Sequence, residues 1–296
     1  YPDLPKGYQI TQMTKPIVEN GSIKIVTDDS EKIVNITRAH LEEDAGKSIH
    51  DLFEGETGVD LNRAGTPLLE IVSEPEISNA KEAVAYFKAI RQLVTFLDIC
   101  DGNMAQGSMR CDVNVSIKKS GDTELGTRAE LKNINSFKFI EKAINFEIDR
   151  QIRVIESGQS VVQETRLYDS EKNETRSMRS KEHANDYRYF PDPDLIPITI
   201  SKERIQEIEK LLPELPEQKI VRFIKDYKIS EYESKNLNAS RELSNFFEKF
   251  AKKISSPDLA AKWILGDLMA ILNKNNSDIQ DSKISSEDMI NLLCKI

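Results

Sequence analysis

GSMRCDVNVSIKKSGDTELGTRAELKNINS, residues 107–136, is the stretch that decides the fold expected for the first part of the chain. Apolar and polar residues alternate through both of its halves, and a turn-forming segment, residues 119–122, separates them. Because successive side chains of a strand point to opposite faces, the pattern predicts two strands with one apolar and one polar face. The polar face would carry Arg110, Asp112, Asn114, Arg128, Glu130 and Lys132.

Two interpretations of this polar face follow from its residue types. The charged side chains can simply face water, as they do on the solvated side of many antiparallel sheets. Arginine and lysine also hold phosphate oxygens, and carboxylates hold hard divalent cations. The residue types are therefore as compatible with a site for polyphosphate, metal and carboxylate chemistry as with a solvated surface.

Composition indicates a globular protein with room for two domains. The 296 residues are 39% hydrophobic and 31% charged, and no apolar run approaches the length of a membrane span. The three cysteines and three histidines are scattered, so we expect reduced thiols and no histidine-rich metal site. Residues 200–296 are electrically neutral, so the net charge of −9 comes from residues 1–199. An acidic domain suits Mg²⁺ chemistry better than bulk attraction to nucleic acid.

The predicted secondary structure changes near residue 200. Earlier, short strands are predicted over residues 8–12, 22–26, 32–38, 68–72 and 161–168, and amphipathic helices over 79–99 and 136–156. Later, helices are predicted over residues 203–212, 217–227, 230–237, 241–254, 257–273 and 286–293. We therefore predict an α+β domain over residues 1–199 and an all-helical domain over residues 200–296.

Acidic residues suggest a candidate metal site in the α+β domain. The segment HLEEDAGK, residues 40–47, contains three consecutive carboxylates that repel one another unless they are solvated or bound to a cation. It is compatible with a surface acidic turn and with a ligand cluster for a hard cation. Glu70 interrupts an apolar strand, where a buried carboxylate needs a partner or a metal. We therefore expect Glu70 to have a functional role.

A polar segment, SEKNETRSMRSKE at residues 170–182, is predicted to form a loop. Its Arg176 and Arg179 are compatible with a solvated basic loop. They are also compatible with a mobile loop that closes over a nucleotide or an RNA backbone. Prolines in the segment that follows, residues 186–195, exclude a central strand there and predict an edge strand or a rigid turn.

Six blocks of sequence, in this order, resemble the B-subunit family of aspartyl/glutamyl-tRNA amidotransferases. They are YPDLPKGYQI (1–10), HLEEDAGKSIH (40–50), DLNRAGTPLLEIVSEPEI (60–77), GSMRCDVNVSI (107–117), GTRAELKNINSFKFIEKAI (126–144), and ETRLYD with TRSMRSKEHANDYRYFPDPDL (164–195). The resemblance is dense through residue 198 and rests on order and character in the helical part. It implies a catalytic domain similar to the glutamine synthetase/guanidino kinase fold, built on an antiparallel sheet.

The resemblance also implies a function. Members amidate Glu-tRNA(Gln), and often Asp-tRNA(Asn), with ammonia that the A subunit releases from glutamine. The B subunit would use ATP and Mg²⁺ to convert the carboxylate on the misacylated tRNA into an acyl phosphate. The implied partners are the A and C subunits and the tRNA, without a membrane, in a bacterial cytoplasm or an organellar matrix.

Site residues are expected on two grounds. The resemblance assigns metal binding to Glu43 and Glu70, with Glu42 beside them, and places Tyr1 and Lys6 near an ammonia path. Strand alternation places Arg110, Asp112, Glu130 and Lys132 at the catalytic centre. The expected nucleotide-binding residues are Arg110, Asn114, Lys132, Arg176 and Arg179.

The family pattern also has parts that this sequence does not show. A strand with further metal ligands would precede Tyr1 and a tail domain would follow Ile296, so we expect a fragment that is inactive alone. Two other functions fit the residues. A ligase of the glutamine synthetase type would turn over ATP with free glutamate. A non-catalytic scaffold that docks tRNA and the A subunit would tolerate Glu70→Gln.

Overall fold

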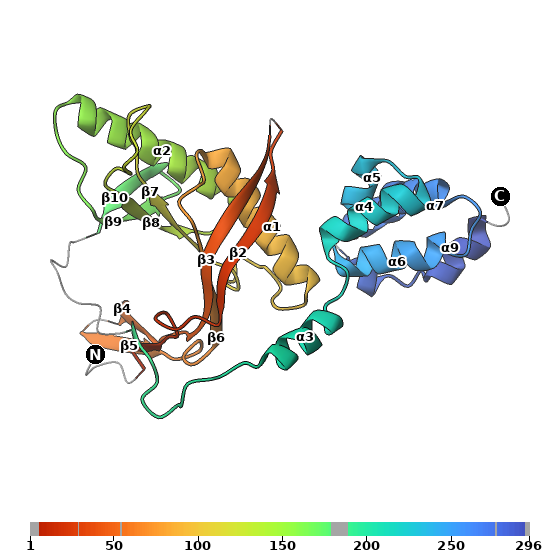
Figure 1. Ribbon diagram of the computed structural model, residues 1–296, viewed down its shortest axis with the longest axis horizontal. Coiled ribbons are helices and arrows are strands. Elements are labelled where there is room, and N and C mark those ends of the chain that lie inside the picture. The colour runs from red at the N-terminus through yellow and green to blue at the C-terminus, as the bar shows by residue number, and fades with distance from the viewer. Residues whose placement is uncertain (1–5, 29, 54, 179–188, 276, 294–296) are drawn as a thin grey trace. The chain divides into compact units, whose positions relative to one another are not determined.

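The computed structural model describes residues 6–28, 30–53, 55–178, 189–275 and 277–293 (Figure 1). The chain divides into two compact units, Tyr1–Ala89 with Arg110–Thr199, and Ile90–Met109 with Ile200–Ile296. The prediction of a mixed α+β region followed by a helical region is confirmed. Residues 90–109, which the prediction assigns to the first domain, group with the helices, so the boundaries 1–199 and 200–296 stay predictions.

One sheet of the first unit has the strand order β2–β3–β6, with antiparallel neighbours. Its strands are β2 (Val18–Val26), β3 (Glu31–Glu43) and β6 (Pro67–Ser73). Strand β3 continues through the acidic segment, where His40 pairs with Glu70. An acidic turn is therefore excluded for residues 40–43, because pairing with β6 gives this backbone its hydrogen bonds in extended form.

Short strands complete the edges of the first unit. They are β1 (Gln9–Ile10), which pairs parallel with β11 (Tyr189–Phe190), and β4 (Lys47–Phe53), which pairs antiparallel with β5 (Glu56–Asp60). The β4–β5 pair was not predicted, because its glycines and charged residues have weak strand propensity. Strand β11 agrees with the predicted edge strand, whose earlier residues lie outside the described part of the chain.

A second large sheet, the four-stranded one, has the strand order β10–β9–β8–β7. Its strands are β7 (Cys111–Val115), β8 (Ala129–Ile134), β9 (Thr165–Asp169) and β10 (Glu174–Ser177). The predicted antiparallel arrangement is wrong for β8 and β9, which run parallel. Helix α2 (Phe137–Glu156) connects them. It is a crossover connection, which allows the second strand to run in the same direction as the first. The predicted loop over residues 170–182 is also wrong where β10 forms.

Helix α2 covers one face of this sheet and leaves the polar face open. Ser136 caps the helix by accepting a 3.2 Å hydrogen bond from the backbone N–H of Phe139. Ile140 and Ile144 of the helix and Val115 and Leu131 of the sheet are all buried. The predicted alternation is confirmed, since Asp112 and Asn114 are exposed between residues that turn inward.

The second unit is helical. Its helices are α3 (Lys202–Leu211), α4 (Pro216–Tyr227), α5 (Glu231–Leu237), α6 (Arg241–Ala251), α7 (Pro257–Trp263), η1 (Ile264–Leu268), α8 (Met269–Lys274), η2 (Ile279–Asp281) and α9 (Ser286–Leu293). The predicted helix over residues 257–273 is interrupted by the π-helical turn η1. Helix α1 (Ala80–Phe96) begins in the first unit and ends in the second. Within the described residues, none of the helices is both long and apolar enough to cross a bilayer.

Replacing Phe247 by alanine should unfold the second unit at lower denaturant concentration. Phe247 is 0% exposed, and its ring lies 5.1 Å from that of Phe223 and 5.3 Å from that of Tyr227. The resulting cavity should lower the free energy of unfolding by about 3–5 kcal/mol. Fluorescence of Trp263, the single tryptophan, reports this unit directly. The control, Tyr232→Ala at a 75% exposed position, should change it by less than about 0.5 kcal/mol. Equal midpoints for the two variants would contradict the assignment of this core.

Candidate active site

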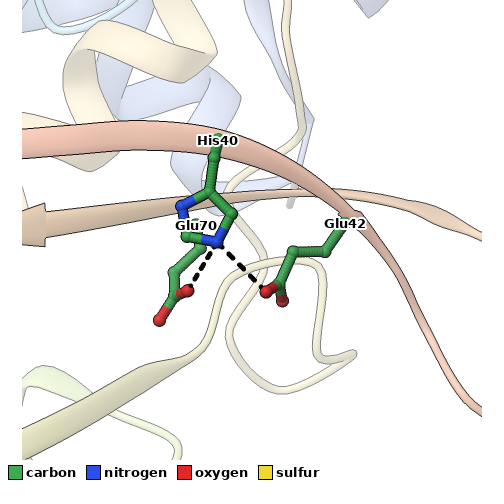
Figure 2. Close-up of side chains that lie close together, drawn as sticks. All are labelled: His40, Glu42 and Glu70. Carbon is green, nitrogen blue, oxygen red and sulfur yellow. Dashed lines mark hydrogen bonds and ion pairs between the residues drawn. The ribbon is translucent and has the colours of Figure 1, made fainter. Parts of the chain in front are cut away.

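Three possible metal ligands meet on one face of the β2–β3–β6 sheet (Figure 2). His40 and Glu42 lie two residues apart on β3 and therefore share a face, and Glu70 is the cross-strand neighbour of His40. Nε2 of His40 lies 2.9 Å from a Glu70 oxygen and 3.1 Å from a Glu42 oxygen. The candidate ligand atoms all lie within 4.8 Å of one another. Figure 2 shows this imidazole nitrogen directed at both carboxylates.

The cluster is buried at one end and open at the other. The His40 side chain is 0% exposed, that of Glu42 is 12% exposed and that of Glu70 is 49% exposed. Thr11 donates a 2.8 Å hydrogen bond that orients the Glu42 carboxylate. Within the described part of the chain, no group hydrogen-bonds Nδ1 of His40. The polar contacts of the imidazole are therefore concentrated on the carboxylate side.

This donor set fits a divalent cation. Carboxylate oxygens are the ligands that Mg²⁺ and Mn²⁺ prefer, whereas imidazole also suits Zn²⁺ and other transition metals. A set of three protein ligands leaves coordination positions for water or phosphate oxygens. The sequence prediction included Glu42 and Glu70 but gave no role to His40. His40 could have been recognised from the sequence, because it lies two residues before Glu42 and residues at this spacing on a strand share a face.

Glu43 lies outside this cluster. It follows Glu42 on β3 and therefore points to the opposite face of the sheet from Glu70. Its carboxylate forms a 2.5 Å ion pair with Nζ of Lys6, whose ammonium also lies 4.0 Å from the ring centroid of Tyr8. A metal-binding role for Glu43 and an ammonia path past Lys6 stay predictions. Tyr1 lies outside the described residues.

The open face of the other sheet carries a continuous row of polar contacts. Lys132 Nζ lies 2.9 Å from an Asp112 oxygen and 3.2 Å from Glu130 Oε1. The other Glu130 oxygen accepts a 2.7 Å hydrogen bond from the hydroxyl of Thr165. The row crosses β7, β8 and β9 and joins three of the residues expected at the catalytic centre. Asn114 pairs with Glu130 across β7 and β8, so it lies on the same face.

Lys132 is the positive centre of this row. Burial acts to lower the pKa of its ammonium, but the hydrogen bonds and charges of Asp112 and Glu130 outweigh burial and raise that pKa above its usual value. The lysine is therefore cationic at neutral pH and is shared between two carboxylates. A divalent cation that took these carboxylates would free the ammonium to bind an anionic group.

Arg110 lies just before β7 and binds Asp44, the third carboxylate of the acidic segment, which had no role of its own among the expected site residues. Its guanidinium donates a 2.7 Å hydrogen bond to Asp44 Oδ2, which also accepts a 2.8 Å hydrogen bond from Arg63 Nε. The Asp44 side chain is 13% exposed and follows the last residue of β3. This contact joins the end of β3 to the start of β7, so it links the strand that holds the histidine cluster to the strand that begins the polar row.

The predicted basic loop contributes one described arginine. Arg176 lies on β10 opposite Leu167, and it forms ion pairs of 3.1 Å with Asp169 and 2.9 Å with Glu174. It is therefore a strand residue held by two acids. Arg179 lies outside the described residues. Nucleotide-binding roles for both arginines stay predictions.

Two further reactive groups, one on β7 and one on α1, are held in their neutral forms. Burial, and then the nearby charge of Asp112, raises the pKa of the Cys111 thiol to about 12. Burial is also the main cause that raises the pKa of the Tyr86 hydroxyl to about 12. Neither group ionises near neutral pH, so neither provides a nucleophile or a general base under those conditions.

The first unit is thus an α+β module whose sheets carry one histidine–carboxylate cluster and one lysine–carboxylate row. The chain belongs to the GatB/GatE catalytic domain family, whose model matches residues 1–206. A second model, the GatB domain, matches residues 245–296.

Curated relatives agree with this family. The chain is 58% identical to the B subunit of the aspartyl/glutamyl-tRNA(Asn/Gln) amidotransferase of Vesicomyosocius okutanii over 297 aligned residues. It is 59% identical to the protein of the same name from Pseudomonas fluorescens and 58% to that from Ectopseudomonas mendocina. Each alignment covers 100% of this chain and 62% of the relative, so the chain spans less than two thirds of their length.

Proposed function

We propose that this chain carries the carboxylate-activating site of a glutamine-dependent tRNA amidotransferase. The observation that carries the proposal is the row on the open sheet face, where Lys132 bridges Asp112 and Glu130. Carboxylates that can take up a cation, next to an ammonium that can take up a phosphoryl group, suit the formation of an acyl phosphate. The relatives, which are named as B subunits of aspartyl/glutamyl-tRNA(Asn/Gln) amidotransferase, support the same reaction.

ATP and Mg²⁺ are the proposed cofactors. Glu42, Glu70 and His40 form one set of residues that would hold a divalent cation, and Asp112 with Glu130 forms another. Bound Mg²⁺ would neutralise charge on the phosphates. The chain's own cations, Lys132 and Arg110, would orient the phosphoryl group. Asn114 would add a hydrogen-bonding group on the same face.

We also propose a particular fold for the first unit. A sheet covered by a helix on one face and open on the other supports a likeness to the glutamine synthetase/guanidino kinase fold. In such an arrangement the substrates lie on the uncovered side. The parallel pair β8–β9 shows that the sheet is mixed rather than wholly antiparallel.

The proposed partners are the A and C subunits of the amidotransferase and a misacylated tRNA(Gln) or tRNA(Asn). Ammonia from the A subunit would travel past the Lys6–Glu43 pair, where an ammonium and a carboxylate already form a short contact. The proposed compartment is a bacterial cytoplasm, since these relatives come from bacteria, or an organellar matrix.

The test uses the full-length subunit that contains this chain, in complex with its partner subunits. Misacylated tRNA is expected to stimulate ATP turnover and to yield amidated aminoacyl-tRNA, whereas free glutamate and aspartate are not. Glu130→Gln keeps the size of the side chain but removes its charge, and it should abolish the stimulation. ATP turnover with free glutamate would favour the rival ligase, and unchanged amidation by Glu130→Gln would contradict the proposed site.

A further inference from the structure

Thr165 is the residue of the polar row to which neither sequence pattern nor family likeness assigned a role. It lies at the start of β9, opposite Glu130 in the parallel β8–β9 pair. Its hydroxyl lies 2.7 Å from Glu130 Oε2, while Lys132 contacts the other oxygen, Oε1. Each carboxylate oxygen of Glu130 therefore has its own partner, and the plane of the carboxylate is fixed.

The hydroxyl has a defined direction. An ionised carboxylate only accepts hydrogen bonds, so Thr165 is the donor in this contact. Threonine is branched at Cβ, which restricts its χ1 rotation. A hydrogen bond to a charged acceptor is stronger than one between neutral groups. Thr165 thus restrains Glu130 at little cost in side-chain entropy.

The strand that carries Thr165 is itself anchored from the other face of the sheet. Arg166, the next residue, points away from the row and contacts Glu164, Thr175 and the fully buried Glu147. Its Nε lies 2.8 Å from the Thr175 hydroxyl, and its second guanidinium nitrogen lies 2.8 Å from the Thr175 carbonyl oxygen. These contacts tie β9 to β10 and to α2. They restrain the strand on which Thr165 lies.

We propose that Thr165 is a positioning residue that orients the Glu130 carboxylate for the divalent cation and phosphate chemistry of the row. This inference rests on the proposed function, because it assigns Thr165 a role through Glu130. Residues that orient metal-binding groups change metal affinity or activity by about 10–100-fold when they are removed. Thr165 itself need not touch substrate.

The experiment compares three variants of the full-length subunit in its complex. Thr165→Val keeps the shape and removes the hydroxyl, and Thr165→Ser keeps the hydroxyl. Thr37→Val is the matched control, because Thr37, on strand β3, also donates a 2.7 Å hydrogen bond to a glutamate, Glu74, which follows the last residue of β6. Two readouts are measured, the Mg²⁺ concentration for half-maximal amidation and the dissociation constant for Mg²⁺ alone by calorimetry. Calorimetry is done with each change in a Glu70→Gln background, which weakens the histidine cluster.

Thr165→Val should raise both Mg²⁺ constants by about 10-fold or more. Thr165→Ser and Thr37→Val should leave each constant within about 3-fold of the parent used in that assay, the unsubstituted protein for amidation and Glu70→Gln for calorimetry, since the first retains the donor and the second is away from the row. Unchanged Mg²⁺ constants for Thr165→Val would overturn the inference. An equal loss of Mg²⁺ affinity in Thr165→Ser or Thr37→Val would also overturn it. Glu130→Gln separates the two hypotheses. If Glu130→Gln is inactive while Thr165→Val is normal, only the positioning role of Thr165 is wrong. If Glu130→Gln retains full amidation and Mg²⁺ affinity, the proposed activating site is wrong as well.

Discussion

Glu70→Gln is expected to reduce amidation by the full-length subunit in its complex by about 100-fold or more, the loss typical of removing one group that stabilises transition-state charge. The substitution preserves the volume of the side chain and removes one of two carboxylates that face His40 Nε2. Glu70 is also the most exposed member of the cluster, at 49%. Among the proposed ligands of this cluster, it is therefore the one that a phosphate-bound cation from solvent would reach first.

The measurement is single-turnover formation of amidated aminoacyl-tRNA at saturating ATP. Glu31→Gln is the matched control, because Glu31 begins the same strand β3 and forms an exposed pair of 2.7 Å with Lys24. Exposed ion pairs contribute little, so this control should stay within about 2-fold of the unsubstituted protein. Near-normal amidation by Glu70→Gln would favour a scaffold over a catalytic role for this chain.

Glu147→Ala is expected to lower the free energy of unfolding of the first unit by about 3–5 kcal/mol. Glu147 is 0% exposed and accepts hydrogen bonds of 2.9 and 2.6 Å from Arg150 and of 2.9 Å from Gln151. Its carboxylate also lies 3.5 Å from Arg166 Nε. Removing it takes away the acid that both largely buried guanidinium groups share and leaves Glu164 as their remaining acidic partner. Removing one partner of a buried ion pair is strongly destabilising, because the remaining charge has lost both water and its counterion.

Denaturation followed by circular dichroism measures this loss, while Trp263 fluorescence reports the second unit separately. Glu141→Ala is the control, since Glu141 lies on the same helix and is exposed. It should change the free energy of unfolding by less than about 0.5 kcal/mol. A fluorescence transition that moves while the first-unit transition stays fixed would contradict the structural role given to Glu147.

Local pattern was enough to predict the open polar face. The alternation from Met109 to Ile117 and around Glu130 set which side chains turn outward, because the two-residue period of a strand is independent of its neighbours. The structure confirms this for Asp112 and Asn114, which are exposed beside the buried Val115. Helical periodicity similarly predicted α2 and most helices of the second unit.

Contacts between distant segments could not be predicted in this way. Thr165 meets Glu130 only because β9 returns parallel to β8 after α2, and no local signal specifies that register. His40 meets Glu70 only because β3 continues beyond the residues with clear strand propensity and pairs with β6. Arg176 was expected in a loop, since its neighbours are polar and show no strand pattern. It lies instead on the short strand β10, which is recognised only by its pairing with β9.

The geometry of β3 gives two chemically identical neighbours different surroundings. Glu42 faces an imidazole and Glu43 faces an ammonium, on opposite sides of one sheet. Inserting or deleting a single amino acid upstream in that strand would turn each carboxylate to the opposite face of the sheet without altering either side chain. The number of residues in the strand therefore determines which face each acid occupies, so substitutions are tolerated in this region more readily than insertions or deletions.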